Sequence, residues 1–217
     1  MILSPRLLKI AQCIDCDVLA DIGTDHGYIP IFSVDNGFCK KAIACDINVG
    51  PLISAKENIE LYNLNGKIET RLSNGLEALL PMEADTIVIA GMGGLLIRDI
   101  LTDGAEKIGN ETTLILQPMV AVDQLREFLL KNGYDILKEH LAREGDKFYN
   151  ILCVKKGQCQ YSEKEILFGK GLENDENYND YMVFHKNVIE KILNGLKKSS
   201  NKEEEIEYYK KILDMIQ

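Results

Sequence analysis

The chain has 217 residues, of which 46% are hydrophobic, and a formal net charge of −9 at pH 7. This length suits one sizeable core with an appendage, and the negative charge argues against indiscriminate nucleic-acid binding while leaving room for a localised basic face. The longest uncharged run, residues 86–97, is too short for a membrane span, and Arg6 and Lys9 interrupt the N-terminal apolar stretch, which makes it a poor signal peptide. We therefore expect a cytoplasmic protein with no membrane partner.

Apolar segments of strand length alternate with segments of helix length over the first 132 residues. Ser4 followed by Pro5 predicts a helix N-cap with proline at the first helical position, so a short helix leads the chain. Strands are then predicted at 18–22, 41–46, 68–72, 86–90 and 113–117. Helices are predicted to begin at Tyr28 and to cover 50–62, 95–101 and 122–132. Near-continuous apolar strands separated by helices are typical of a parallel sheet covered on both faces.

The remainder of the chain departs from this alternation. Segments 134–142 and 147–155 both have strand character with no helix between them, which predicts an antiparallel ribbon at the edge of the sheet. Composition changes after Gly157, and apolar residues at helical spacing predict helices over 178–196 and 206–216, joined by a polar turn at 198–201. We therefore predict an α/β, Rossmann-like domain at 1–157 and a helical hairpin or coiled-coil-like domain at 158–217.

The turn after the first predicted strand is the strongest indication of a ligand. Asp21 ends that strand, Gly23 and Gly27 flank an acidic tip, and Asp46 ends the next strand about 20 positions further on. A Rossmann-type unit places its acceptor for ribose hydroxyls at this spacing. The alternatives are that the glycines serve only a tight turn and that Asp46 caps the following helix.

The acidic tip of this turn, Asp25 with His26, indicates which ligand is bound. A carboxylate would repel a pyrophosphate, but it suits the amino group and sulfonium of S-adenosylmethionine. Other polar and glycine residues follow the remaining strands and should meet at the same edge of a parallel sheet. The predicted cofactor-binding residues are Asp21, Gly23, Asp25, His26, Asp46, Ile47, Asn74, Gly75, Gly91 and Met92.

Five motifs occur in one order: residues 21–30, Gly50-Pro51-Leu52, Asn74-Gly75-Leu76, Ala90-Gly91-Met92-Gly93-Gly94 and Leu116-Gln117-Pro118. In this order they resemble the TrmK family of bacterial tRNA (adenine-N1)-methyltransferases. The resemblance covers nearly the whole chain and implies a methyltransferase domain, S-adenosyl-L-methionine as cofactor and tRNA as partner. It further implies that the target is N1 of the adenine at tRNA position 22.

The 90–94 turn offers only backbone groups, whereas enzymes that methylate an exocyclic amine commonly have an Asn/Asp-Pro-Pro-aromatic loop there. A ring nitrogen already has an in-plane lone pair, so positioning can supply most of the rate acceleration. Asp25 is predicted to stabilise the cationic product ring or to accept an N6 proton. Tyr28 is predicted to contact the extruded base, although core packing explains it equally well. Gln117, at a strand end, completes the predicted catalytic set.

Metal binding is not expected. Cys13 and Cys16 form a C-x-x-C pair, but no second pair or suitably spaced histidine completes a zinc site. His140 and His185 have no acidic or cysteine partner at ligand spacing and are predicted to be structural. The thiols are therefore predicted to pack as small hydrophobic groups.

Three points stay open at this stage. The C-terminal helices suit either tRNA recognition or self-association, and the oligomeric state is undetermined. Alternative functions are a non-catalytic nucleotide-binding interaction module and a small-molecule methyltransferase. The basic face could draw on any of Arg6, Lys9, Arg98, Arg126, Lys131, Lys138, Arg143 and Lys147.

Overall fold

The computed structural model describes residues 1–198 and 202–216 and divides into two compact units. We call Met1–Gln160 the sheet unit and Tyr161–Gln217 the helical unit. The division falls three residues after the predicted domain boundary at 157. Apart from Lys198, the predicted polar turn at 198–201 lies outside the described residues.

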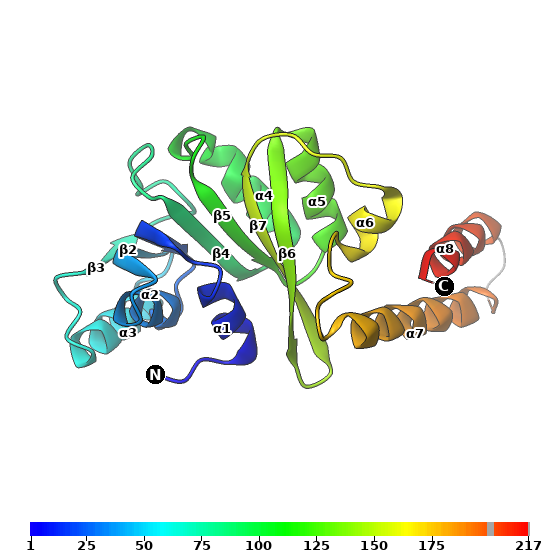
Figure 1. Cartoon of the computed structure of the whole chain (residues 1–217), viewed down its shortest axis with the longest axis horizontal. Coiled ribbons are helices and arrows are strands. Elements are labelled where there is room, and N and C mark those ends of the chain that lie inside the picture. Colours follow the sequence, from blue (N-terminus) through cyan, green and yellow to red (C-terminus); the bar gives the residue numbers. More distant parts are fainter. Residues whose placement is uncertain (199–201, 217) are drawn as a thin grey trace. The chain divides into compact units, whose positions relative to one another are not determined.

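The sheet unit is built on a seven-stranded sheet in the order β3-β2-β1-β4-β5-β7-β6 (Figure 1). Its strands are β1 Cys16–Ile22, β2 Cys39–Asp46, β3 Ile68–Leu72, β4 Thr86–Met92, β5 Thr113–Pro118, β6 Tyr134–Glu144 and β7 Lys147–Lys156. The first five are parallel, whereas β7 pairs antiparallel with both β5 and β6. The predicted Rossmann-like sheet with an antiparallel edge ribbon is confirmed.

Two layers of helices cover this sheet. Helices α1 Pro5–Ala11, α2 Tyr28–Asp35 and α3 Val49–Leu61 contact one another in series on one face. On the other face, α4 Gly94–Asp103 contacts α5 Val122–Lys131. A short 3-10 helix, Ala105–Lys107, was not predicted. Helix α1 begins as predicted. The Ser4 hydroxyl accepts the Leu7 N–H, and Pro5, at the first helical position, has no N–H that would require an acceptor.

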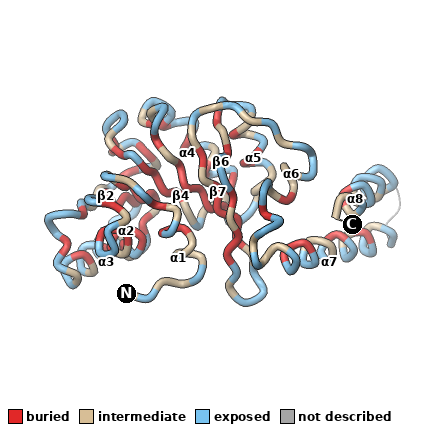
Figure 2. Tube along the Cα trace, viewed as in Figure 1, coloured by how far each residue is buried: buried red, intermediate tan, exposed pale blue. Residues whose placement is uncertain are grey.

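The core lies between the sheet and these helices. Figure 2 shows the buried residues concentrated along the strands. Leu19, Val88, Ile115 and Ile151 come from β1, β4, β5 and β7 and belong to one cluster of buried apolar side chains. Because parallel strands are buried on both faces, they show the near-continuous apolar pattern on which the sequence prediction rested.

The described residues of the helical unit form three helices: α6 Glu163–Phe168, α7 Tyr178–Leu196 and α8 Glu203–Ile216. Helices α7 and α8 contact each other, as expected for a hairpin (Figure 1). Helix α6 was not predicted, although Ser162 and Glu165 form a capping box that signals its start. His185 lies among aromatic rings, with its ring centroid 4.4 Å from that of Tyr181. No helix in the described ranges combines the length and apolar character needed to cross a membrane.

A buried ion pair joins α5 to the edge ribbon. Arg126 and Glu139 are both fully buried, and Arg126 Nη2 lies 2.7 Å from Glu139 Oε2. Arg126 Nε also donates to Glu139 Oε2, at 3.0 Å. The assignment of Arg126 to a basic surface is therefore wrong: the side chain is part of the interior. Each charge is tolerated there because the other neutralises it.

We predict that Arg126→Met lowers the free energy of unfolding by about 3–5 kcal/mol, because it leaves Glu139 buried without its ionic partner. Urea denaturation followed by circular dichroism measures this change. The double variant Arg126→Met/Glu139→Leu should recover most of the loss. Lys131→Met on the same helix is the matched control, since its pair with Glu127 is exposed and should contribute less than about 1 kcal/mol. Equal losses in the two single variants would contradict the prediction.

Candidate active site

A pocket of about 400 Å³ lies where parallel strands end. It brings together five residues predicted from the sequence, namely Asp21, Gly23, Asp25, Tyr28 and Gly91. They come from the end of β1, the turn after it, the start of α2 and the end of β4. This convergence follows from parallel pairing of β1 with β4, which places their carboxyl ends at one edge.

A second hollow of about 390 Å³ adjoins the ends of β2 and β3. Ile47 and Asn74 line it, together with Leu72. Ile47 and Leu72 are exposed apolar side chains, so this hollow offers a surface for a flat, weakly polar ring. The Asn74 amide donates to Glu77 Oε1 at 3.0 Å. Gly75, with φ +57, lines a smaller neighbouring cavity that Asn74 also borders.

A larger cavity of about 850 Å³ runs along β2, β3 and α3. None of the predicted site residues lines it, and its walls include Lys41, Lys56 and Arg71. We assign the site to the strand ends because ligands of open parallel sheets bind at the carboxyl ends of the strands.

The turn after β1 has a backbone that requires glycine. Gly23 has φ +77, and its N–H and that of Thr24 both donate to the carbonyl of Cys45 at 2.8 Å. These bonds fix the turn against the end of β2. A Cβ atom on Gly23 would lie 2.2 Å from Met92 Cε. The turn therefore requires glycine at position 23 for steric reasons. The side chain that approaches Gly23 is that of Met92, which is itself a predicted site residue.

Two buried carboxyl groups end the neighbouring strands β1 and β2. Burial raises the pKa of Asp21 to about 6, and the charge of Asp46 acts in the same direction. Asp46 Oδ1 accepts the N–H of Asn48 at 2.7 Å. No other hydrogen bond to this carboxylate occurs within residues 1–198 and 202–216, so its second oxygen is available to a ligand. Asn48 is the N-cap residue of α3, so the helix-cap explanation of Asp46 is wrong.

Asp25 and Tyr28 line the 400 Å³ pocket at exposed positions, and His26 contacts both of them. His26 Nε2 lies 3.3 Å from Asp25 Oδ1, and the Asp25 side chain is 76% exposed. The His26 ring stacks on that of Tyr28, with centroids 5.3 Å apart and an interplanar angle of 20°. Tyr28 is 38% exposed, so core packing does not explain it. These three residues, which we call the rim, thus combine a carboxylate with a flat aromatic surface.

Gln117 lies at the end of β5, as predicted, but its side chain does not line the 400 Å³ pocket. It is fully buried, and its Oε1 accepts Arg6 Nη1 at 2.7 Å and the Gly91 N–H at 3.2 Å. Its Nε2 donates to the carbonyl of Pro118 at 2.8 Å. Both ends of the amide are thus engaged within the protein, and the side chain has no exposed surface. The catalytic role of Gln117 stays a prediction, and in this structure its amide joins Arg6 to the β4 turn.

Arg6 is a charged residue of the site that sequence reasoning missed. It lines the 400 Å³ pocket, and its guanidinium carbon lies 5.5 Å from the centroid of the Tyr149 ring. Its backbone N–H donates to Glu144 Oε1 at 2.9 Å, which attaches the start of α1 to the ribbon. Sequence assigned Arg6 only to a basic surface. Nothing in its local pattern indicates that α1 packs against β6 and β7, from where the Arg6 side chain reaches Gln117 at the end of β5.

The comparisons with known proteins agree with this architecture. Residues 3–152 match a family model described as a methyltransferase domain. The Bacillus subtilis tRNA (adenine(22)-N(1))-methyltransferase is 40% identical over 171 residues, or 78% of this chain and 72% of that protein.

Two solved structures with ligands are also similar. A Streptococcus pneumoniae protein in complex with S-adenosyl-L-methionine is 36% identical, with a TM-score of 0.86 over 98% of this chain and 100% of that one. TrmK of M. capricolum, in complex with S-adenosyl-homocysteine, is 34% identical, with a TM-score of 0.84 over 100% of both chains. The resemblance stated from the five motifs is confirmed, and the chain belongs to the TrmK family of tRNA (adenine(22)-N(1))-methyltransferases.

Proposed function

We propose that this protein transfers the methyl group of S-adenosyl-L-methionine to N1 of adenine 22 in tRNA. The observation that supports this most directly is the position of Asp46 between two hollows. Asp46 directly precedes Ile47, which lines the 390 Å³ hollow, and its charge raises the pKa of Asp21, which lines the 400 Å³ pocket. A ligand with an adenine at one end and an amino acid at the other fits this arrangement around a central ribose.

The residues present have the donor and acceptor chemistry that such a cofactor needs. The Asp46 carboxylate would accept the ribose hydroxyls, while Ile47 and Leu72 would contact the adenine. Asp21 and Asp25 would face the amino group and the sulfonium, whose positive charges favour carboxylates. When bound, the cofactor supplies a methyl group activated by its sulfonium. The backbone of Gly23 and Gly91 would border the methionine portion.

The target adenine would enter at the rim. N1 lies on the Watson–Crick edge, so the base must leave its stack, and Tyr28 with His26 offers a flat surface to receive it. Methyl transfer makes the ring cationic, and Asp25 would stabilise this charge or accept a proton from N6. Arg6, held by Gln117, would keep the opposite wall in place. We place this reaction in the cytoplasm.

The direct test is methylation of unmodified tRNA by the purified protein, with the product nucleosides identified by mass spectrometry. We expect N1-methyladenosine in wild-type tRNA and none in tRNA with guanine at position 22. Equal methylation of both tRNAs would overturn the assignment of the target. Methylation of free adenosine but not of tRNA would favour a small-molecule substrate.

We predict that Asp46→Ala weakens binding of S-adenosyl-homocysteine by on the order of 2–3 kcal/mol, or roughly 30- to 150-fold in Kd. The variant loses the acceptor for both ribose hydroxyls. Isothermal titration calorimetry gives the affinity directly. Asp17→Ala is the control, because Asp17 belongs to β1 but is exposed and pairs with Lys40. An unchanged affinity in Asp46→Ala would remove Asp46 from the cofactor site.

We predict that Asp25→Asn lowers the single-turnover rate of tRNA methylation, measured with saturating cofactor, at least about tenfold, and that this loss exceeds any loss of folding stability. The substitution keeps the shape of the side chain but removes the charge that faces the product ring. Asp35→Asn serves as the control, since Asp35 is an exposed carboxylate at the end of α2. A parental rate in Asp25→Asn, with cofactor saturating, would exclude Asp25 from transition-state stabilisation.

We further propose that the helical unit contributes to tRNA binding, because every motif that could contact the cofactor lies in the sheet unit. A chain ending at Gln160 should bind S-adenosyl-homocysteine as the full chain does but bind tRNA more weakly. The difference in tRNA affinity should shrink as salt rises if phosphate contacts are responsible. Filter binding at several salt concentrations measures it. Equal tRNA methylation by both chains would assign the helical unit to self-association or stability, which analytical ultracentrifugation would then distinguish.

A further inference from the structure

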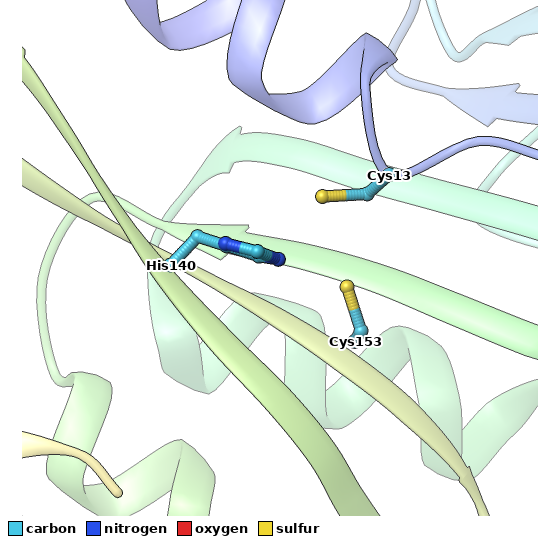
Figure 3. Close-up of side chains that lie close together, drawn as sticks. All are labelled: Cys13, His140 and Cys153. Carbon is cyan, nitrogen blue, oxygen red and sulfur yellow. The ribbon is translucent and has the colours of Figure 1, made fainter. Parts of the chain in front are cut away.

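A cluster of potential metal ligands lies in the sheet unit, away from the residues assigned to methyl transfer. It consists of Cys13, just after α1, His140 on β6 and Cys153 on β7. One ligand atom from each residue lies within 4.8 Å of the others, and all three residues are half-buried. Figure 3 shows the three side chains directed toward one another. The expectation that His140 has no cysteine partner is therefore wrong.

The sheet register explains why the two ribbon residues meet. Cys153 pairs with Lys138, and His140 pairs with Ile151, so His140 and Cys153 are diagonal neighbours on one face of the β6–β7 ribbon. Helix α1 packs against both strands. Cys13 follows the last turn of α1 and lies close to the pair, and its N–H donates to the carbonyl of Ile10 at 3.0 Å. His140 and Cys153 are thus held by two paired strands, and Cys13 is held by the turn that ends α1.

The donor set has a definite metal preference. Two thiol sulfurs with one imidazole suit borderline-soft ions such as Zn²⁺, whereas Mg²⁺ and Ca²⁺ require oxygen ligands. Zinc binds sulfur at about 2.3 Å and nitrogen at about 2.0–2.1 Å, which gives tetrahedral donor separations of roughly 3.5–3.8 Å. Donors within 4.8 Å reach that spacing by side-chain movements on the order of 1 Å.

We propose that Cys13, His140 and Cys153 bind one zinc-type cation, with solvent as the fourth ligand. Three protein ligands with an open fourth position form a complete tetrahedral site, and the half-buried cluster lets water reach that position. Cysteine binds a metal ion as its thiolate. The bound ion would fasten the end of α1 to the ribbon, and α1 is the helix that bears Arg6.

Cys16 provides the matched control. It completes the C-x-x-C pair with Cys13 and is also half-buried, but it lies on β1, in register with Cys39 of β2. It is not a member of the three-residue cluster. If the metal is held by the tertiary cluster, Cys16→Ser leaves binding intact. If the local C-x-x-C pair were the site, Cys16→Ser would abolish binding.

The test uses the full chain, prepared with reductant and chelator and then titrated with Co²⁺ and Zn²⁺ under anaerobic conditions. We expect one ion per chain and a near-ultraviolet thiolate-to-cobalt charge-transfer absorption, in the parent and in Cys16→Ser alike. Cys13→Ser and Cys153→Ser should each weaken Zn²⁺ binding at least about 100-fold, since losing a direct ligand exceeds the 10- to 100-fold effect of losing an outer partner. His140→Gln should weaken binding while retaining the charge-transfer absorption.

A second measurement keeps the proposal testable if a serine variant fails to fold. Zn²⁺ should protect Cys13 and Cys153 of the parent protein from alkylation, but not Cys16, as read by peptide mass spectrometry. It should also raise the Tm of the parent and of Cys16→Ser. Absence of the charge-transfer absorption, equal alkylation of all three thiols with and without Zn²⁺, or a Cys13–Cys153 disulfide in freshly prepared protein that excludes the metal would overturn the proposal.

Discussion

Burial of two carboxyl groups at the ends of adjacent strands is the constraint on which the site depends. Parallel pairing of β1 with β2 places Asp21 and Asp46 at the same edge of the sheet, where both are largely shielded from water. The raised pKa of Asp21 means that the folded state binds this proton more tightly than the unfolded state. Stability therefore falls as pH rises from the ordinary aspartate pKa through about 6. A ligand with hydroxyl and cationic groups relieves this unfavourable arrangement.

The opposite wall of the pocket depends on a single buried amide. Gln117 Oε1 joins the Arg6 guanidinium to the Gly91 N–H, so one acceptor links α1, β4 and β5. Because Arg6 also contacts Glu144 and Tyr149, the edge ribbon supports this wall from the other side. The ribbon that distinguishes this sheet from an ordinary nucleotide-binding fold is thus connected to the pocket through Arg6.

Sequence reasoning succeeded where the signal was local. The apolar strands, the glycine turn and the carboxylates at strand ends follow from periodicity and spacing, and the structure brings Asp21, Asp25 and Gly91 to one pocket. The prediction for Arg126 failed because its burial depends on pairing with Glu139 of β6, the next strand in the chain. Sequence reasoning also placed Gln117 at a strand end correctly but could not determine that Arg6 and Gly91 engage its amide. The two contacts of the Gln117 amide join residues 26 and 111 positions apart, and no local sequence pattern indicates them.

In the β6–β7 ribbon, one extra residue changes which side chains of β6 face the interior, so the alternation of apolar and polar residues along the strand does not predict them. The β6–β7 register shifts between Ile136 and Lys138, so Leu137 is an extra residue that reverses the in–out alternation of the strand. Ile136 is buried before the shift and Glu139 after it, although the two are an odd number of positions apart. The shift turns Glu139 toward Arg126 and leaves His140 on the face of Cys153 and α1. A strand without this bulge would point His140 toward α5, so the buried ion pair and the thiol–imidazole cluster both depend on Leu137.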